Sequence, residues 1–188
     1  MKRIIIISAK ARHGKDTLGE HLKKRLEERG EVVVIDRFAK YIKSYLKDYY
    51  GWDGVTKDEA VRGRLQVLGT DLIKEKLNYK AFHAKRLAED IQINSDFIDT
   101  FIITDTRFRD EVYTLKAMFP NECVCVRINR FNFESDLTDE QKKHKSECDL
   151  DVFNFDYMIS TFENQLDELY AKGDVFLDKL LGGDIVGK

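Results

Sequence analysis

Short apolar segments recur along the chain at lengths typical of β-strands. They cover residues 3–8, 32–36, 101–105, 123–128 and 155–160. Three of these segments are continuous apolar blocks rather than alternating patterns. Continuous blocks are typical of strands that are buried on both faces of a sheet. We therefore expect five buried strands.

Helical periodicity separates the predicted strands. Leu18, Leu22 and Leu26 follow the first strand at i, i+4 spacing, and Gly30 supplies a helix stop. Two further sets with helical spacing are Val61, Leu65, Leu68 and Leu72, and Val112, Leu115 and Phe119. Strands that alternate with helices predict an α/β fold, with a parallel sheet and helices on both of its faces.

Two longer segments interrupt this alternation. Residues 38–99 hold few strand signals, so we expect a helical insertion over one sheet edge, where an acceptor pocket would fit. Residues 131–147 are polar and charged, and they form either a mobile lid or a plain solvated loop. With no repeat or linker in view, we expect one domain over 1–188, with the insertion at about 38–99 and the lid at about 130–147.

Charge, hydropathy and cysteine content narrow the class of protein. Charged residues make up 35% of the chain but leave a net charge of -2, which argues against a nucleic-acid-coating protein. No apolar run approaches the roughly 20 residues that span a bilayer, so we expect no membrane partner. The apolar start is too short for a secretory signal. The three cysteines lack zinc-site spacing, and a reducing, cytoplasmic location is the expectation.

A phosphate-binding loop is predicted where the first strand leads into the first helix. Gly14 lets the backbone approach a phosphate closely, and Lys15 would reach the β- and γ-phosphates. Loop and helix N–H groups would surround the phosphates of ATP. The predicted ATP-binding residues are Ala9, Lys10, Ala11, Arg12, His13, Gly14, Lys15, Asp16 and Thr17.

Two positions depart from the common pattern G-x-x-x-x-G-K-[ST]. Ala9 replaces the first glycine, which is a mild change if this position does not need a positive φ. Asp16 replaces the hydroxyl residue that ordinarily binds Mg²⁺, and a carboxylate can fill that role directly or through water. We therefore expect Asp16 to be a metal ligand.

Further candidate residues follow the other predicted strands. Asp105 ends an apolar strand, as does the acidic residue that holds magnesium in many P-loop enzymes. Arg107 would project from the same sheet edge as a catalytic and acceptor-binding group. Arg130 follows the fourth strand and would stabilise transferring charge as a catalytic residue. Acceptor contacts are also expected from Asp36, Arg37 and Phe38, at the end of the second strand.

Four motifs together resemble the deoxynucleoside monophosphate kinase family of bacteriophages and bacteria. Residues 9–17 read A-K-A-R-H-G-K-D-T, similar to the family's G-K-x-x-x-G-K-D-T, so Asp16 agrees with the family and only Ala9 departs. Residues 62–70 read R-G-R-L-Q-V-L-G-T, similar to R-x-x-L-Q-x-L-G-T. Residues 105–111 resemble D-V-R-F-x-x-E, and residues 144–157 resemble H-x-S-E…L-D…F-D-Y.

The resemblance implies a three-layer α/β/α P-loop fold with a five-stranded parallel sheet, a helical acceptor-binding insertion and a lid. It implies ATP and Mg²⁺ as cosubstrates and a deoxynucleotide as the acceptor. By position it makes Lys15, Asp16 and Thr17 residues of the ATP site. It makes acceptor or metal candidates of Arg62, Gln66, Asp105 and Arg107, and it assigns Arg130 and residues 144–147 to the lid.

Two other functions stay open on the sequence. One is a P-loop kinase for another phosphorylated small molecule, because animal phosphomevalonate kinases carry a similar G-K-D loop. A nucleotide acceptor predicts stacking on an aromatic residue such as Phe38, Tyr41, Tyr45 or Phe82, whereas an isoprenoid acceptor does not. The other is a protein that binds or hydrolyses ATP without transfer. Whether the chain is a monomer or a homodimer is also open.

Overall fold

The computed structural model describes residues 1–56, 58–133, 138, 142–162 and 165–185. Its strands form one five-stranded sheet in the order β2-β3-β1-β4-β5, and every pairing is parallel. The strands are β1 (Arg3–Ala9), β2 (Val33–Asp36), β3 (Thr100–Thr106), β4 (Cys123–Phe131) and β5 (Tyr157–Phe162). All five predicted strands and the parallel sheet are confirmed.

Helices connect the strands and cover the sheet. They are α1 (Lys15–Glu27), α2 (Lys40–Tyr50), α3 (Glu59–Gln66), α4 (Phe82–Ile93), α5 (Arg109–Met118), α7 (Lys145–Cys148) and α8 (Leu166–Gly182), with a π-helical segment, η1 (Val67–Lys76). The helical character predicted for residues 38–99 is confirmed by α2, α3, η1 and α4. The sequence analysis did not predict α8.

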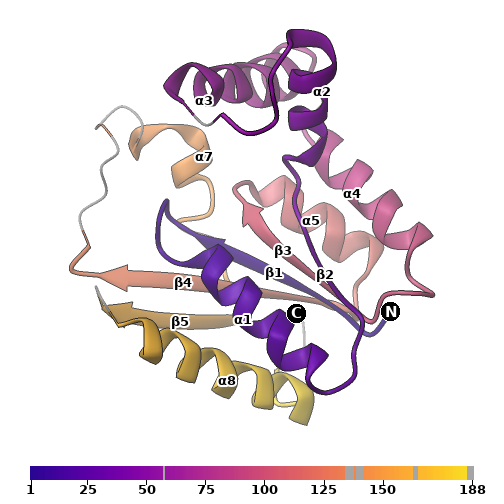
Figure 1. Ribbon diagram of the computed structural model, residues 1–188, viewed down its shortest axis with the longest axis vertical. Helices are drawn as coiled ribbons and strands as arrows, with labels where there is room; N and C mark the ends of the chain where they lie inside the picture. Colours follow the sequence, from indigo (N-terminus) through magenta and orange to yellow (C-terminus); the bar gives the residue numbers. More distant parts are fainter. Residues whose placement is uncertain (57, 134–137, 139–141, 163–164, 186–188) are drawn as a thin grey trace.

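Two apolar cores lie on opposite faces of the sheet. Ile5 and Ile7 pack in one core with buried residues of α1 and α8. Ile4 and Ile6 pack in the other, with buried residues of α4 and α5. Figure 1 shows this layering, with α1 and α8 on one side of the sheet and α2 and α3 grouped at one end of the molecule. Successive strand residues point to opposite faces, which is why four consecutive isoleucines are all buried.

Gly19 sets the close approach of α1 to the sheet. A methyl group at this position would lie 2.6 Å from Cγ2 of Thr104 on β3. The missing side chain therefore lets α1 rest directly on β3, and it holds the start of α1 beside the carboxyl end of that strand. In an open parallel sheet, this is the edge where ligands bind.

The cysteines behave as ordinary thiols of this fold. Cys123 and Cys125 are both buried in the core beneath α4 and α5, and Cys148 is exposed and free. Burial raises the pKa of the Cys123 thiol to about 12. Within the described ranges, no helix is both long and apolar enough to cross a bilayer.

Candidate active site

The loop between β1 and α1 has the backbone geometry of an anion cradle. Arg12 has φ 61° and Gly14 has φ 89°, so the chain turns sharply into α1. Ala9 ends β1 with an ordinary strand conformation, and its replacement of glycine causes no strain. Gly14 caps α1 without a side-chain hydrogen bond to the first turn. The first N–H groups of the helix thus point toward the loop, where they favour an anion.

A cavity of about 380 Å³ opens beside this loop. It brings together four predicted ATP-site residues and Arg130; its lining is Arg12, His13, Gly14, Thr17, Arg130, Thr161, Phe162, Gln165, Leu166 and Leu169. Of the last five, Thr161 and Phe162 belong to β5, Gln165 caps α8, and Leu166 and Leu169 belong to α8. The sequence analysis missed all five. Leu166 and Leu169 have helical spacing with Phe176 and Leu177, a signal that could have revealed this wall.

Arg130 and His13 are joined at the rim of this cavity. The Arg130 backbone N–H donates to Nδ1 of His13 at 3.1 Å, and Arg130 Nη1 donates to the carbonyl of Arg12 at 3.1 Å. Burial, followed by the charges of Arg127, Arg130 and Lys10, lowers the pKa of His13 to about 4. His13 is therefore neutral at physiological pH and serves as an acceptor that fixes the loop to β4.

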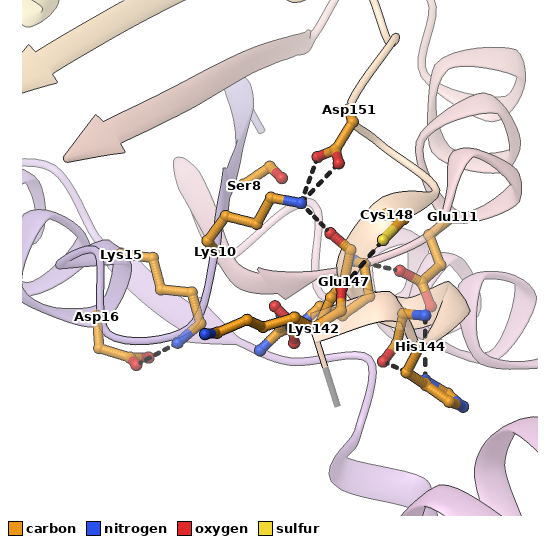
Figure 2. Close-up of polar contacts among 12 residues, drawn as sticks. Ser8, Lys10, Lys15, Asp16, Glu111, Lys142, His144, Glu147, Cys148 and Asp151 are labelled. Carbon is orange, nitrogen blue, oxygen red and sulfur yellow. Dashed lines mark hydrogen bonds and ion pairs between the residues drawn. The ribbon is translucent and has the colours of Figure 1, made fainter. Parts of the chain in front are cut away.

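Asp16 lies at the centre of a polar network at the start of α1. Its carboxylate accepts hydrogen bonds from Lys15 Nζ at 3.0 Å, Thr104 Oγ1 at 2.9 Å and Arg37 Nη2 at 3.2 Å. Burial raises the pKa of Asp16, but the charge of Lys15 and these hydrogen bonds outweigh it, so the pKa falls below its ordinary value. Figure 2 shows the Lys15–Asp16 pair facing the loop. Asp16 is ionised and half-exposed, as a magnesium ligand would need to be.

A second cavity, of about 210 Å³, lies between the helical insertion and the end of β3. Its lining includes four residues predicted from the sequence: Phe38, Gln66, Asp105 and Arg107. Other lining residues are Ala39, Ile42, Leu65, Gly69, Thr70, Lys74, His83, Phe108, Glu111 and Ser146. We call this the acceptor cavity.

Glu111 ties the walls of the acceptor cavity together. Its Oε1 accepts a hydrogen bond from Lys74 Nζ of η1 at 3.0 Å. Its Oε2 accepts from the backbone N–H groups of Arg107 and Phe108 at 2.9 and 3.0 Å. Lys74 and Glu111 are both buried, and Lys74 Nζ lies 3.3 Å from the ring centroid of Phe108. Sequence reasoning missed Lys74, because no local pattern reveals a buried charge that pairs with a distant helix.

The structure does not bring Asp105 to Asp16. Thr104 reaches Asp16, and the next residue points to the other face of β3. The two carboxylate oxygens of Asp105 accept the backbone N–H groups of Phe38 and Ala39 at 2.9 and 3.0 Å. Among the residues the structure describes, no cluster of three or more His, Cys, Asp or Glu could hold a metal. A magnesium ion here would depend on Asp16 and on phosphate oxygens.

Asp105 makes stability depend on pH. Burial raises the pKa of Asp105 from 3.8 to about 6. The folded protein therefore binds a proton more tightly than the unfolded chain, and this contribution grows as pH falls from 7 towards 5. We expect urea unfolding to show that wild type gains about 1 kcal/mol between pH 7 and pH 5 relative to the Asp105→Asn variant. An equal pH dependence in the two proteins would contradict this assignment.

The remaining predicted residues lie outside the acceptor cavity. Arg37 pairs with Asp16, and Asp36 accepts from the Arg37 N–H at 2.7 Å and from Lys40 Nζ at 2.5 Å. Arg62 is exposed on α3. The predicted lid falls partly on residues 134–137 and 139–141, which lie outside the described residues.

An ion-pair cluster joins the phosphate loop to the α7 segment, and Figure 2 shows Lys10, Glu147 and Asp151 of this cluster. Arg107 Nη1 donates to Glu147 Oε1. Lys10 Nζ donates to the Glu147 carbonyl at 2.5 Å and to Asp151 at 2.6 Å. Arg127 pairs with the same Asp151 at 3.3 Å. The phosphate loop, β4 and the α7 segment thus meet at one point.

Comparisons with known proteins identify the fold. No protein-family model matches the chain. No curated protein matches it either. Among solved structures, a sugar kinase from Janibacter sp. HTCC2649 is similar with a TM-score of 0.53 and 11% identity, covering 95% of this chain and 95% of that one.

APS kinases are similar to the same extent. The Mycobacterium tuberculosis APS kinase CysC, solved with AMPPNP and APS, has a TM-score of 0.51 and 12% identity, covering 94% of this chain and 97% of that one. A hexameric APS kinase from Thiobacillus denitrificans has a TM-score of 0.51 and 14% identity, covering 94% of this chain and 29% of that one. At these identities the likeness shows the fold alone: the chain has the three-layer α/β fold of P-loop kinases.

Proposed function

We propose that this protein is an ATP- and Mg²⁺-dependent kinase that transfers the γ-phosphate of ATP to a (deoxy)nucleoside monophosphate, giving the diphosphate. One observation carries the proposal. Glu147 contacts both Lys10 of the phosphate loop and Arg107 of the acceptor cavity, so the loop and this cavity meet at a group of cations. Phosphoryl transfer needs little from a protein beyond such placement of two anions and stabilisation of their charge.

The residues have separate roles in this proposal. Lys15 and the first N–H groups of α1 would hold the β- and γ-phosphates, beside the cavity that Arg12, His13 and Thr17 line. Asp16 would hold Mg²⁺, which when bound supplies charge neutralisation between phosphate oxygens. Arg107 and Arg130 would stabilise charge on the transferring group.

The lining of the acceptor cavity supports a nucleotide over an isoprenoid acceptor. Phe38 and Phe108 supply aromatic surface, while Gln66, Lys74 and His83 supply polar groups in the same cavity. A nucleobase has both a flat apolar face and a polar edge. Phosphomevalonate has a carboxylate and a hydroxyl for the polar groups but no flat ring for the two aromatic faces. Tyr41, Tyr45 and Phe82, the other aromatic candidates for stacking, do not line this cavity.

The experiment is a coupled ADP-release assay with ATP and Mg²⁺ against deoxy- and ribonucleoside monophosphates and phosphomevalonate. We expect ADP release that depends on a nucleoside monophosphate and identifies its base. Release with phosphomevalonate alone would keep the kinase and replace its acceptor. Slow release that ignores every acceptor would leave a protein that binds or hydrolyses ATP. Gel filtration of the same sample would show whether the chain is a monomer or a homodimer.

A further inference from the structure

Glu147 lies where the acceptor cavity meets the phosphate loop. Its carboxylate accepts a hydrogen bond from Arg107, which lines the acceptor cavity. Its backbone carbonyl accepts one from Lys10 Nζ of the loop at 2.5 Å. Figure 2 shows the Lys10 side chain extended between the loop and the α7 segment to make these contacts. Glu147 therefore contacts one cation of the phosphate loop and one cation of the acceptor cavity.

The cluster around Glu147 carries excess positive charge. Lys10, Arg107 and Arg127 contribute three cations, and Glu147 and Asp151 contribute two carboxylates. Arg127 is almost fully buried and also donates to Ser8 Oγ at 2.9 Å, so its charge is held in place by β1. The cluster thus favours an anion with more charge than one carboxylate.

The carboxylate of Glu147 is not fully hydrogen-bonded in this cluster. Its Oε2 atom is buried and has no hydrogen-bond partner within the described part of the chain. A buried carboxylate oxygen without a donor is unfavourable. A phosphate monoester has three terminal oxygens and nearly two negative charges at neutral pH. It therefore offers arginine and lysine more hydrogen-bond acceptors and more negative charge than a carboxylate does.

We propose that Arg107 and Lys10 form the binding site for the phosphate dianion of the acceptor, and that Glu147 occupies this site until the acceptor displaces it. The proposal rests on the proposed function, since it takes the acceptor to be a phosphate monoester. A dianion held here lies beside Lys10 of the phosphate loop. Glu147 then competes with the acceptor for Arg107 in the free protein.

The test measures inorganic phosphate binding to the full chain by isothermal titration calorimetry. Glu147→Gln keeps the shape of the side chain but removes its charge, so phosphate should bind about three- to tenfold more tightly than to wild type. In the double variant Glu147→Gln/Arg107→Ala the gain should disappear, because both changes act on one contact. Glu147→Asp should also bind phosphate more tightly than wild type, since the shorter carboxylate reaches Arg107 less well.

Glu75→Gln is the matched control. Glu75 of η1 pairs with Lys145 of α7 at 2.9 Å, so this variant removes another ion pair of the same segment without touching Arg107 or Lys10. Its phosphate affinity should equal that of wild type. Unchanged or weaker binding in both Glu147 variants would overturn the proposal, as would equal tightening in Glu75→Gln. Phosphate binding needs no phosphoryl transfer, so this result is independent of whether the ADP-release assay finds an acceptor.

Discussion

Lys15→Ala is expected to lower kcat about 10²- to 10³-fold, which is the range for removing one charged group that stabilises a transition state. Lys15 follows Gly14 at the start of α1, and its Nζ contacts Asp16 at 3.0 Å. In the transition state it would instead follow the charge of the γ-phosphoryl group. The measurement is the steady-state rate at saturating ATP and acceptor.

The fold should survive this substitution. The Lys15–Asp16 pair lies at the surface of the loop, where such pairs contribute little to stability. Lys23→Ala is the matched control, because Lys23 belongs to the same helix and forms a surface pair with Glu27 at 3.7 Å. Its kcat should match wild type. Near-normal turnover by Lys15→Ala, with unchanged circular dichroism, would contradict the assignment of the phosphate loop.

Phe176→Ala is expected to have the largest effect on stability, about 3–5 kcal/mol of unfolding free energy. Phe176 is fully buried between α8 and the sheet, with its ring centroid 5.2 Å from that of Tyr157. Its removal would leave a cavity beneath α8, the helix whose start forms one wall of the cavity beside the phosphate loop. Urea unfolding at constant pH measures the loss.

The adjacent Val175→Ala variant is the control for Phe176. Val175 is 49% exposed, so its truncation should cost within about 0.5 kcal/mol. A loss below about 1 kcal/mol in Phe176→Ala would mean that α8 does not pack on the sheet as described.

The strands and the phosphate loop were predictable because their signals are local. Four consecutive isoleucines, a loop with Gly14 and Lys15, and leucines at i, i+4 spacing each report on neighbouring residues. The three-layer α/β fold follows from their alternation, and the structure confirms it. The C-terminal helix α8 carried an equally local signal that was overlooked.

The contacts that define the candidate site were not predictable, since they join distant parts of the chain. Asp105 was predicted to hold magnesium from its place at a strand end. The direction of its side chain depends on the alternation of β3, where Thr104, not Asp105, reaches Asp16. The pairing of Arg107 with Glu147 crosses 40 positions in the sequence, so no local pattern contains it. The spacing of Leu65, Leu68 and Leu72 likewise predicted one α-helix, whereas the structure has α3 followed by the π-helical segment η1.

The most direct test of the account follows the γ-phosphate itself. ATP labelled at the γ-position would be incubated with the protein, Mg²⁺ and each nucleoside monophosphate, and the products would be separated by thin-layer chromatography. The account predicts that label leaves ATP and appears in a nucleoside diphosphate, and that Lys15→Ala nearly abolishes its appearance. Label found only in inorganic phosphate, or retained in ATP with every acceptor, would contradict the claim that this chain is a phosphotransferase acting on a nucleoside monophosphate.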